Sequence, residues 1–437
     1  MRCISVLLPA AALAAAAWFL TIPSANAYSL LGGSLGLSQR DLRVFDNFAD
    51  TTANNNTTPD PNFPGYTGVE MACWKGAVEW GSELHGTGNG DPHQNGGLGS
   101  GGANFDPSWQ GNGPTPGGAK DNIVAAIAGD FSGVLAYCTT PIEVGWSIRF
   151  FEDAWNWDDG PGTSVSGFDL QGVMCHEYGH ALGLGHSSDG SATMYPSVSG
   201  NGIPQRSISS DDIAGVQAIY GVKSPGKPRI TGIAVAGSNL TISGQNFSAT
   251  GNEVWFTKGG TGGVGTPIKV TGVGSNGVSI SVTVPSLASD GDVLVRNSGT
   301  SHANLSNAWP IDLGSGFGCG VISMGGNLTG NSGNLTTSSV PIQGTSMTFQ
   351  VSGLNITGFG RRIIGLVPTQ QSVLGFTMLV DYTVAVSLMP FALSGGAGTF
   401  TETLPLLPGT TIFVQGTAIQ PNLKIIGTNR LDVTICP

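Results

Sequence analysis

The spacing of apolar residues changes along the chain, and the changes predict where helices lie. Over residues 67–83, apolar side chains recur at intervals of three and four, which is the period of a helix with one buried face. Residues 169–183 have the same period, and Asp169 stands where an N-cap is expected. Residues 211–220 follow two serines and predict a third helix that ends at Gly221.

Alternating apolar and polar residues predict strands in the rest of the chain. In the first half these are 134–137 and 146–151, whereas residues 86–119 are rich in Gly, Asn and Pro and predict a long surface loop. Beyond residue 228 only strands are predicted, and they include 240–242, 254–256, 280–284, 293–295, 347–351, 379–386 and 431–435.

The first 27 residues form a separate segment. Arg2 precedes an apolar run over residues 6–20, and Ala25, Asn26 and Ala27 form a small-x-small site, which together are typical of a signal peptide. We therefore expect cleavage near Ala27 and a secreted protein, extracellular or on the cell surface. The run is short for a membrane span, so membrane insertion is not expected.

These patterns predict several domains in a chain of 437 residues. We assign residues 28–222 to an α+β unit and 222–227, which contain Pro and Gly, to a linker. Two all-β sandwich modules are expected at 228–312 and 313–437, because short strands there alternate with turn residues.

The amino-acid composition limits which binding partners are expected and bears on whether the cysteines form disulfides. Charged residues make up 10% of the chain and the net charge is −11, which argues against nucleic acid as a partner. Export would permit disulfides, and we expect Cys319 to pair with Cys436; Cys73 with Cys138 is a weaker pairing. Cys175 on the second helix is expected to be a buried thiol.

The chemistry is concentrated in eleven residues. His176 and His180 lie four apart on a predicted helix, so that both rings share one face. Gly183 ends the helix, and the chain can then bring His186 to the same point. Three imidazoles leave the fourth position of a tetrahedral Zn²⁺ ion open, which is typical of a catalytic site.

Glu177 lies beside the two helical histidines, where a carboxylate can act as the general base toward a water molecule. The sequence therefore predicts a zinc-dependent endopeptidase that hydrolyses peptide bonds in protein or peptide substrates. An alternative stays open, in which a degenerate peptidase domain belongs to a non-catalytic surface adhesion or carbohydrate-binding protein. The intact Glu177 favours the enzyme, because a decayed site would tolerate its loss.

The stretch from His176 to His186 resembles the extended zinc motif of the metzincins, and residues 191–196 around Met194 look like their Met-turn. The zinc motif and the Met-turn are most similar in form to those of the matrixins. The segment 211–221 also resembles the closing helix of matrixins. The resemblance implies a metzincin-like α+β catalytic domain with zinc, and an apolar floor under the metal made by Met194. Two matrixin features are missing, an inhibitory cysteine peptide and a second His-Asp cluster.

Two further histidines and one acidic segment could bind metal ions, and each has a second interpretation. His85 and His93 lie in a polar loop and are expected to be solvated, with accessory metal ligation as the alternative. Residues 155–160 carry carboxylates that could bind a structural Ca²⁺ ion, although a turn with packed tryptophans is the preferred interpretation.

Residues 244–247, with the sequence Gly-Gln-Asn-Phe, and the strands around them resemble the TIG (immunoglobulin-like) fold. That resemblance implies a spacer or binding role for 228–312. Residues 313–437 look like C-terminal modules of secreted proteins, for which an extracellular polysaccharide or surface ligand and a purely structural role are both considered.

Overall fold

The computed structural model describes most of the chain beyond residue 25, and the described residues are 26–87, 97–113, 115–129, 131–140, 142–153, 155–162, 165–198, 200, 202–258, 267–314, 320–324, 331–337, 341, 344–373, 376–405, 411–422 and 424–435. No helix in these ranges has the length and apolar character needed to cross a membrane.

The first unit contains a five-stranded sheet with the order β2-β1-β3-β5-β4. Neighbouring strands are parallel except for β4, which is antiparallel to β5 and lies at the edge of the sheet. A short parallel pair, β6 (Trp157–Asp158) and β7 (Phe168–Asp169), lies outside it. The strands of the sheet are β1 (Asp41–Phe45), β2 (Ser108–Asn112), β3 (Ile123–Ile127), β4 (Ala136–Cys138) and β5 (Ser147–Phe151).

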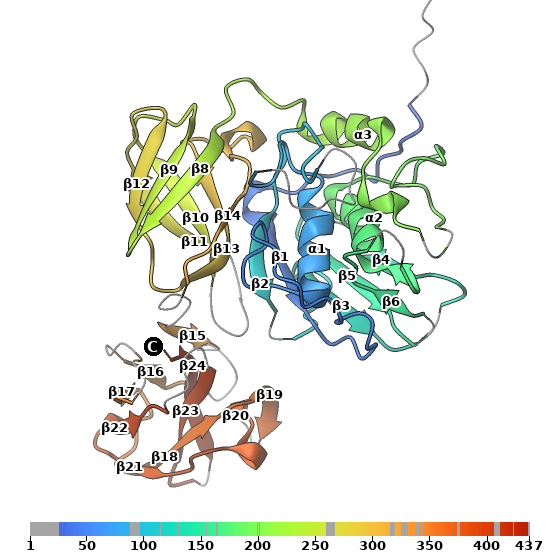
Figure 1. Cartoon of the computed structure of the whole chain (residues 1–437). Helices are drawn as coiled ribbons and strands as arrows, with labels where there is room; N and C mark the ends of the chain where they lie inside the picture. The colour runs from blue at the N-terminus through green and yellow to red at the C-terminus, as the bar shows by residue number, and fades with distance from the viewer. Residues whose placement is uncertain are drawn as a thin grey trace, which may run out of the picture.

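Three helices belong to this unit, α1 (Gly68–Val78), α2 (Leu170–Leu182) and α3 (Ser210–Tyr220) (Figure 1). Alternate residues of the strands form one core with α1 and α2, as the two-residue period of a strand requires. These strand residues are Leu42, Val44, Val124, Ile148 and Phe150.

The local sequence explains where α2 and α3 begin and end. The carboxylate of Asp169 accepts the N–H of Gly172, and Ser209 caps α3 in a reciprocal box with Asp212. Gly183 ends α2 with φ of 108°, a left-handed conformation that glycine adopts at little cost. All three predicted helices are confirmed, although the first is shorter than expected.

The surface loop predicted for residues 86–119 is wrong. Strand β2 runs through it, and Leu98, Phe105 and Trp109 are fully or almost fully buried. Its polar composition hid this strand, because β2 is held by parallel pairing with β1 and not by an apolar pattern of its own. Strands β1 and β3 were also not predicted.

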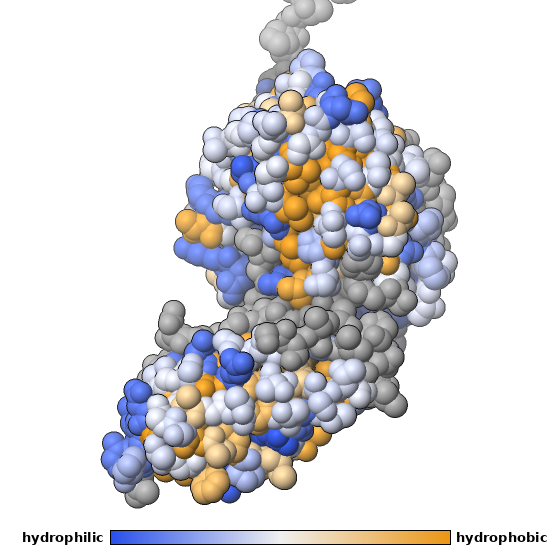
Figure 2. Space-filling model, turned by 90° about the vertical axis from the view of Figure 1, so that its left-hand side faces the viewer, coloured by the Kyte–Doolittle hydropathy of each residue, from blue (hydrophilic) through white to orange (hydrophobic). Residues whose placement is uncertain are grey.

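A second unit consists of two antiparallel sheets, β11-β10-β13-β14 and β12-β9-β8, whose inward side chains form one core. Figure 2 views the molecule from the side on which β8, β9 and β12 lie in Figure 1, and apolar residues gather in the middle of that face. The strands are β8 (Arg229–Ala236), β9 (Asn239–Gln245), β10 (Asn252–Lys258), β11 (Ile268–Val273), β12 (Ser279–Thr283), β13 (Ala288–Arg296) and β14 (Trp309–Ile311).

The C-terminal unit is also built of strands and has its own core. Its sheets are β15-β24-β23-β18-β21, β16-β17-β22 and β19-β20. The strand predicted over 379–386 is wrong beyond Val380, because the Asp381 carboxylate accepts the N–H of Thr383 and starts a 3-10 turn. The strands are β15 (Gly320–Met324), β16 (Asn334–Thr336), β17 (Ser346–Ser352), β18 (Gly358–Gly365), β19 (Pro368–Val373), β20 (Phe376–Val380), β21 (Pro390–Leu393), β22 (Gly398–Thr403), β23 (Thr411–Ile419) and β24 (Ile425–Thr434).

The cysteines follow the expectations only in part. Cys73 lies on α1 and Cys138 on the edge strand β4, and both are free thiols, so the predicted Cys73–Cys138 disulfide is wrong. Cys175 is a buried free thiol, as expected. Cys319 and Cys436 lie outside the described residues.

Candidate metal centre

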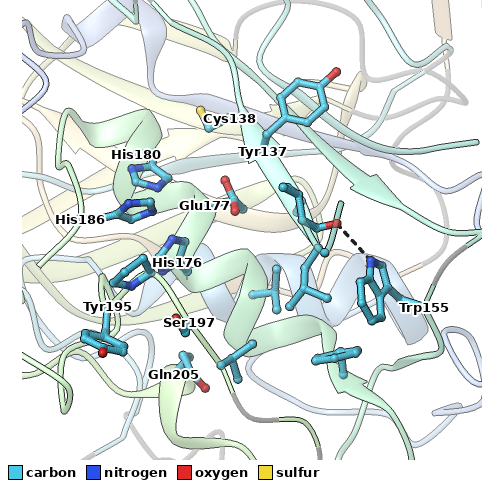
Figure 3. A pocket seen from close by; sticks show the side chains of 18 of the residues that line it. Tyr137, Cys138, Trp155, His176, Glu177, His180, His186, Tyr195, Ser197 and Gln205 are labelled. Carbon is cyan, nitrogen blue, oxygen red and sulfur yellow. Dashed lines mark hydrogen bonds between the residues drawn. The ribbon is translucent and has the colours of Figure 1, made fainter. Parts of the chain in front are cut away.

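The rings of His176, His180 and His186 converge at the C-terminal end of α2 (Figure 3). One ligand atom from each ring lies within 4.8 Å of the others, and no other group of three potential metal ligands occurs among the described residues. The ring centroids are 4.9 Å apart for His176 and His180, 5.4 Å for His176 and His186, and 4.9 Å for His180 and His186. Three nitrogens in such a cluster can share one tetrahedral cation.

The turn after α2 places the third ring. The N–H of Leu184 donates to the carbonyl of Gly179 at 3.0 Å, which closes the helix end. An N-terminal segment then supports the turn, since Leu31 donates to the Gly183 carbonyl and Gly185 donates to the Ser29 carbonyl, each at 2.8 Å.

Backbone carbonyls determine which nitrogen of each helical histidine is free. Nδ1 of His176 lies 2.7 Å from the carbonyl oxygen of Thr193, and Nδ1 of His180 lies 2.7 Å from that of Leu184. A carbonyl oxygen only accepts, so each Nδ1 carries the proton and each Nε2 keeps its lone pair for a metal.

The histidines are also held neutral. Burial, with a smaller repulsion from His180, lowers the pKa of His176 to about 3, and burial lowers the pKa of His180 to about 4. The pKa of His186 is lowered by burial as well. Neutral rings are the form in which imidazole binds a metal ion.

Glu177 lies beside the cluster and is buried, with 6% of its surface exposed. Burial raises the pKa of its carboxyl group to about 8, and the N–H of Cys138 on β4 offsets this in part. Its Oε2 has no hydrogen-bond partner within the protein. A buried carboxyl oxygen left unpaired beside three free imidazole nitrogens fits a site that holds a cation and a water molecule.

Met194 is fully buried against the metal helix. A Cβ atom at Gly179 would overlap with the Met194 sulfur and lie 2.8 Å from the ring of the buried Trp80, so a larger residue there would displace both side chains. The N–H groups of Thr193 and Met194 donate to the Asp212 carboxylate at 2.8 and 3.0 Å, and Asp212 also belongs to the cap of α3. The Met-turn is thereby anchored to α3.

A cavity of about 660 Å³ opens beside the cluster and includes Glu177 (Figure 3). It is bounded by the edge strand β4 on one side and by the segment after the Met-turn on the other. Trp155 donates from Nε1 to the carbonyl of Val134 at 3.0 Å and packs edge to face on Phe168. The lining comes from separate segments, and only the part after the Met-turn could be expected from the resemblance to matrixins. It includes Leu135, Tyr137, Trp155, Phe168, Val173, Tyr195, Val198 and Gln205.

The expectation of a solvated His85 is wrong. His85 is 3% exposed, and its Nε2 lies 2.7 Å from the carboxylate of Asp292, a residue of the second unit. The sequence could not show this, because the two residues are 207 positions apart. His93 lies outside the described residues.

The segment 155–160 contains the packed tryptophan that we preferred, since Trp157 is fully buried. The Asp159 carboxylate accepts the N–H of Asn56 at 2.9 Å, and that of Asp158 accepts the N–H of Gly160 at 2.9 Å. Oδ1 of Asp159 is buried without a hydrogen-bond partner, but no group of three potential metal ligands forms around it among the described residues, so the structure lends no support to a calcium site there.

Comparison with known proteins agrees with this geometry. The family model described as "Matrixin" matches residues 124–221. Human matrilysin is 45% identical over 92 residues, which cover 21% of this chain and 33% of matrilysin. Bovine interstitial collagenase is 37% identical over 114 residues, covering 24% of this chain and 23% of the collagenase. Human matrix metalloproteinase-19 is 45% identical over 92 residues, covering 21% of this chain and 17% of that protein.

The chain thus spans a third or less of the length of these curated relatives. Among solved structures, a tetra-tandem repeat in the extending region of a large adhesion protein aligns with 47% of this chain and 48% of that chain, at 9% identity and a TM-score of 0.16, which is too low to carry an argument. The family match falls on the unit that carries the histidine cluster. Residues 124–221 therefore belong to a matrixin-like domain, of the zinc metalloendopeptidase kind.

Proposed function

We propose that this chain is a secreted zinc-dependent endopeptidase, with His176, His180 and His186 as the zinc ligands and Glu177 as the general base. The observation that carries the proposal is the convergence of three imidazole groups within 4.8 Å beside a buried carboxyl group. When bound, zinc supplies a Lewis acid that polarises a carbonyl group and acidifies water.

The other steps belong to the protein. Glu177 accepts the proton of the attacking water and passes it to the leaving amine. A cation at the histidine cluster lowers the raised pKa of Glu177, since an opposite charge stabilises the carboxylate. The carboxylate is then available as a base at neutral pH.

Peptide substrates fit the surroundings of the site. Strand β4 is an edge strand, so its outer side can pair with an extended peptide. The cavity beyond Glu177 has apolar and aromatic walls, including Leu135, Phe168 and Val173, which suit an apolar substrate side chain next to the scissile bond. We propose protein or peptide substrates with such a side chain.

The remaining units are proposed to be all-β modules at 228–312 and 313–437. Two antiparallel sheets around one core support a TIG-like sandwich for the first of them. The alternative of a non-catalytic adhesion or carbohydrate-binding protein is not favoured, because the histidines and Glu177 are all in place.

The test measures zinc content and peptide cleavage in the purified chain. We expect about one zinc per chain, cleavage that a chelator abolishes, and a Glu177→Gln variant that keeps zinc but loses at least about a hundredfold in kcat. Phe359→Ala, on the exposed surface of the C-terminal unit, is the control and should cleave normally. Chelator-insensitive cleavage, or a Glu177→Gln variant with full activity, would refute the proposal.

A further inference from the structure

The second unit closes the edge of the first unit's sheet. Strand β2 is the outermost strand there, and β10 and β13 lie against it. The hydroxyl of Thr257 donates to the carbonyl of Trp109 at 2.7 Å, and the N–H of Lys258 donates to Oε1 of Gln110 at 3.1 Å. Polar groups of an edge strand that would otherwise need water are therefore satisfied by the second unit.

One carboxylate of the second unit is buried inside the first. Asp292 accepts Nε1–H of Trp74 at 3.0 Å and lies 2.7 Å from Nε2 of His85, and its side chain is fully buried. Trp74 stacks on Trp109 with ring centroids 4.9 Å apart and planes 3° apart. A carboxylate that is removed from water in this way is stable only while its partners remain in place.

Two more polar contacts join the units, one of them buried and the other partly buried. Lys227 pairs with Asp106 at 2.8 Å, and their side chains are 4% and 2% exposed. Arg40 lies 2.8 Å through Nη2 from Nδ1 of His302 and stacks over the ring of Phe105 at 4.3 Å. The segment 222–227, expected as a linker, is itself attached, since Lys223 donates to the Gly102 carbonyl at 2.8 Å.

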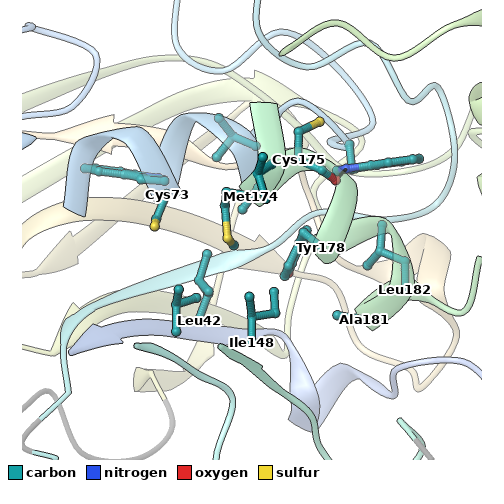
Figure 4. Close-up of a cluster of buried hydrophobic side chains, with 14 of the residues drawn as sticks. Leu42, Cys73, Ile148, Met174, Cys175, Tyr178, Ala181 and Leu182 are labelled. Carbon is teal, nitrogen blue, oxygen red and sulfur yellow. Dashed lines mark hydrogen bonds between the residues drawn. The ribbon is translucent and has the colours of Figure 1, made fainter. Parts of the chain in front are cut away.

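Helix α1 carries Trp74 at this interface and also packs on the metal helix α2, as Figure 4 shows for α1 and α2. Trp74 faces the second unit, while Gly76, on the same helix, packs on the backbone of α2, where a Cβ would lie 2.8 Å from the carbonyl oxygen of Gln171. Trp80 donates from Nε1 to the carbonyl of Cys175 at 2.9 Å, directly before the first histidine of the cluster. The interface and α2 thus share one layer of close packing.

We propose that the unit β8–β14 is an obligate structural partner of the first unit, which contains the matrixin-like residues 124–221, and that the two units fold and unfold as one cooperative body. Separation would break the contacts that Asp292, Asp106 and Arg40 make across the junction, and it would expose the stacked tryptophans to water. Unfolding of either unit therefore requires the other to unfold. The second unit thus stabilises the first, whereas a spacer would only separate domains. This inference does not depend on the proposed enzymatic activity.

Hydrogen exchange followed by mass spectrometry on the full chain tests it. Val282→Ala removes two buried methyl groups on β12, in the sheet β12-β9-β8 of the second unit. We expect amides of α1 and α2 to exchange faster by the same factor as those of β9 and β12, about tenfold or more, because the shared opening is destabilised. The matched control is Met347→Ala in the core of the C-terminal unit, which should leave α1 and α2 unchanged.

A second measurement covers the case in which the variant does not fold. In wild-type protein at low urea concentrations, the slowest amides of α2 and of β9 should show the same opening free energy and the same dependence on urea. Asp292→Asn should lower the opening free energies of the α2 and β9 amides by the same amount. Protection of α2 that persists while β9 and β12 open, in the variant or in urea, would overturn the proposal.

Discussion

Asp169 and Arg206 are joined by two hydrogen bonds of 2.8 and 2.6 Å at the first turn of α2, and both side chains are almost fully buried. The same carboxylate accepts the N–H of Gly172 as the N-cap of the helix. The start of the metal helix is thus fixed both by a cap and by a buried ion pair.

We expect Asp169→Ala to lower the free energy of unfolding by about 3–5 kcal/mol, because it removes the carboxylate that accepts two hydrogen bonds from the buried Arg206 guanidinium. Asp169→Ser can still cap the helix and should recover only about 1 kcal/mol of that loss. Urea denaturation of the two variants measures the difference. An Asp169→Ser protein as stable as the wild type would show that the ion pair contributes nothing.

Glu70 in the first turn of α1 should make the protein less stable at higher pH. Burial, and then repulsion from Asp46, raises the pKa of Glu70 to about 7 in the folded state, whereas a glutamate in an unfolded chain titrates near about 4.3. The folded state therefore holds the proton more tightly, and stability falls as pH rises from about 4.3 to about 7.

We expect the wild type to lose about 1–3 kcal/mol between pH 5 and pH 8 relative to Glu70→Gln, which has no proton to lose at that position. Urea denaturation of both proteins at the two pH values gives the comparison. Parallel pH dependence in the two proteins would mean that Glu70 ionises in the folded state as easily as in the unfolded chain.

Trp155 should determine the size of the substrate side chain that the cavity accepts. Its ring is part of the wall and its Nε1–H donates to Val134 beside the edge strand. Trp155→Ala should shift kcat/KM by about tenfold or more toward peptides with longer apolar side chains next to the cleaved bond, because the cavity is enlarged.

Trp155→Phe separates volume from hydrogen bonding, since it keeps an aromatic wall and removes the donor. We expect it to retain the wild-type preference on a peptide library and to lose only part of the rate. If Trp155→Phe changed the preference as much as Trp155→Ala does, the hydrogen bond to Val134 would set the specificity, and the ring volume would not.

The sequence predicted the parts of the site that depend on neighbours along the chain. The i, i+4 spacing of His176 and His180, the Asp169 cap and the glycine at 183 are local features, and the structure contains the helix and the turn that they predict. The convergence of His186 follows from the same turn, so local sequence alone predicts that the three rings meet, and they do so in the structure.

The rest could not be predicted because it depends on distant partners. Strand β2 has a polar sequence and forms only beside β1 and under the second unit. His85 looks like a loop residue until Asp292 is brought to it, and the cavity wall joins Trp155 to residues after the Met-turn. The periodicity of apolar residues predicts which face of a helix or strand is buried, but it does not predict which element packs on that face.

Zinc should stabilise the folded chain, because the three rings converge only in the folded state. At a free zinc concentration about a hundred times the Kd, the expected gain is about 2.7 kcal/mol, seen as a rise in the melting temperature that a chelator reverses. His186→Ala removes one ligand and should abolish most of this rise. Glu177→Gln removes no ligand and should keep it, so the pair separates metal binding from loss of the base. A rise in melting temperature that survives in His186→Ala would place the zinc elsewhere on the protein.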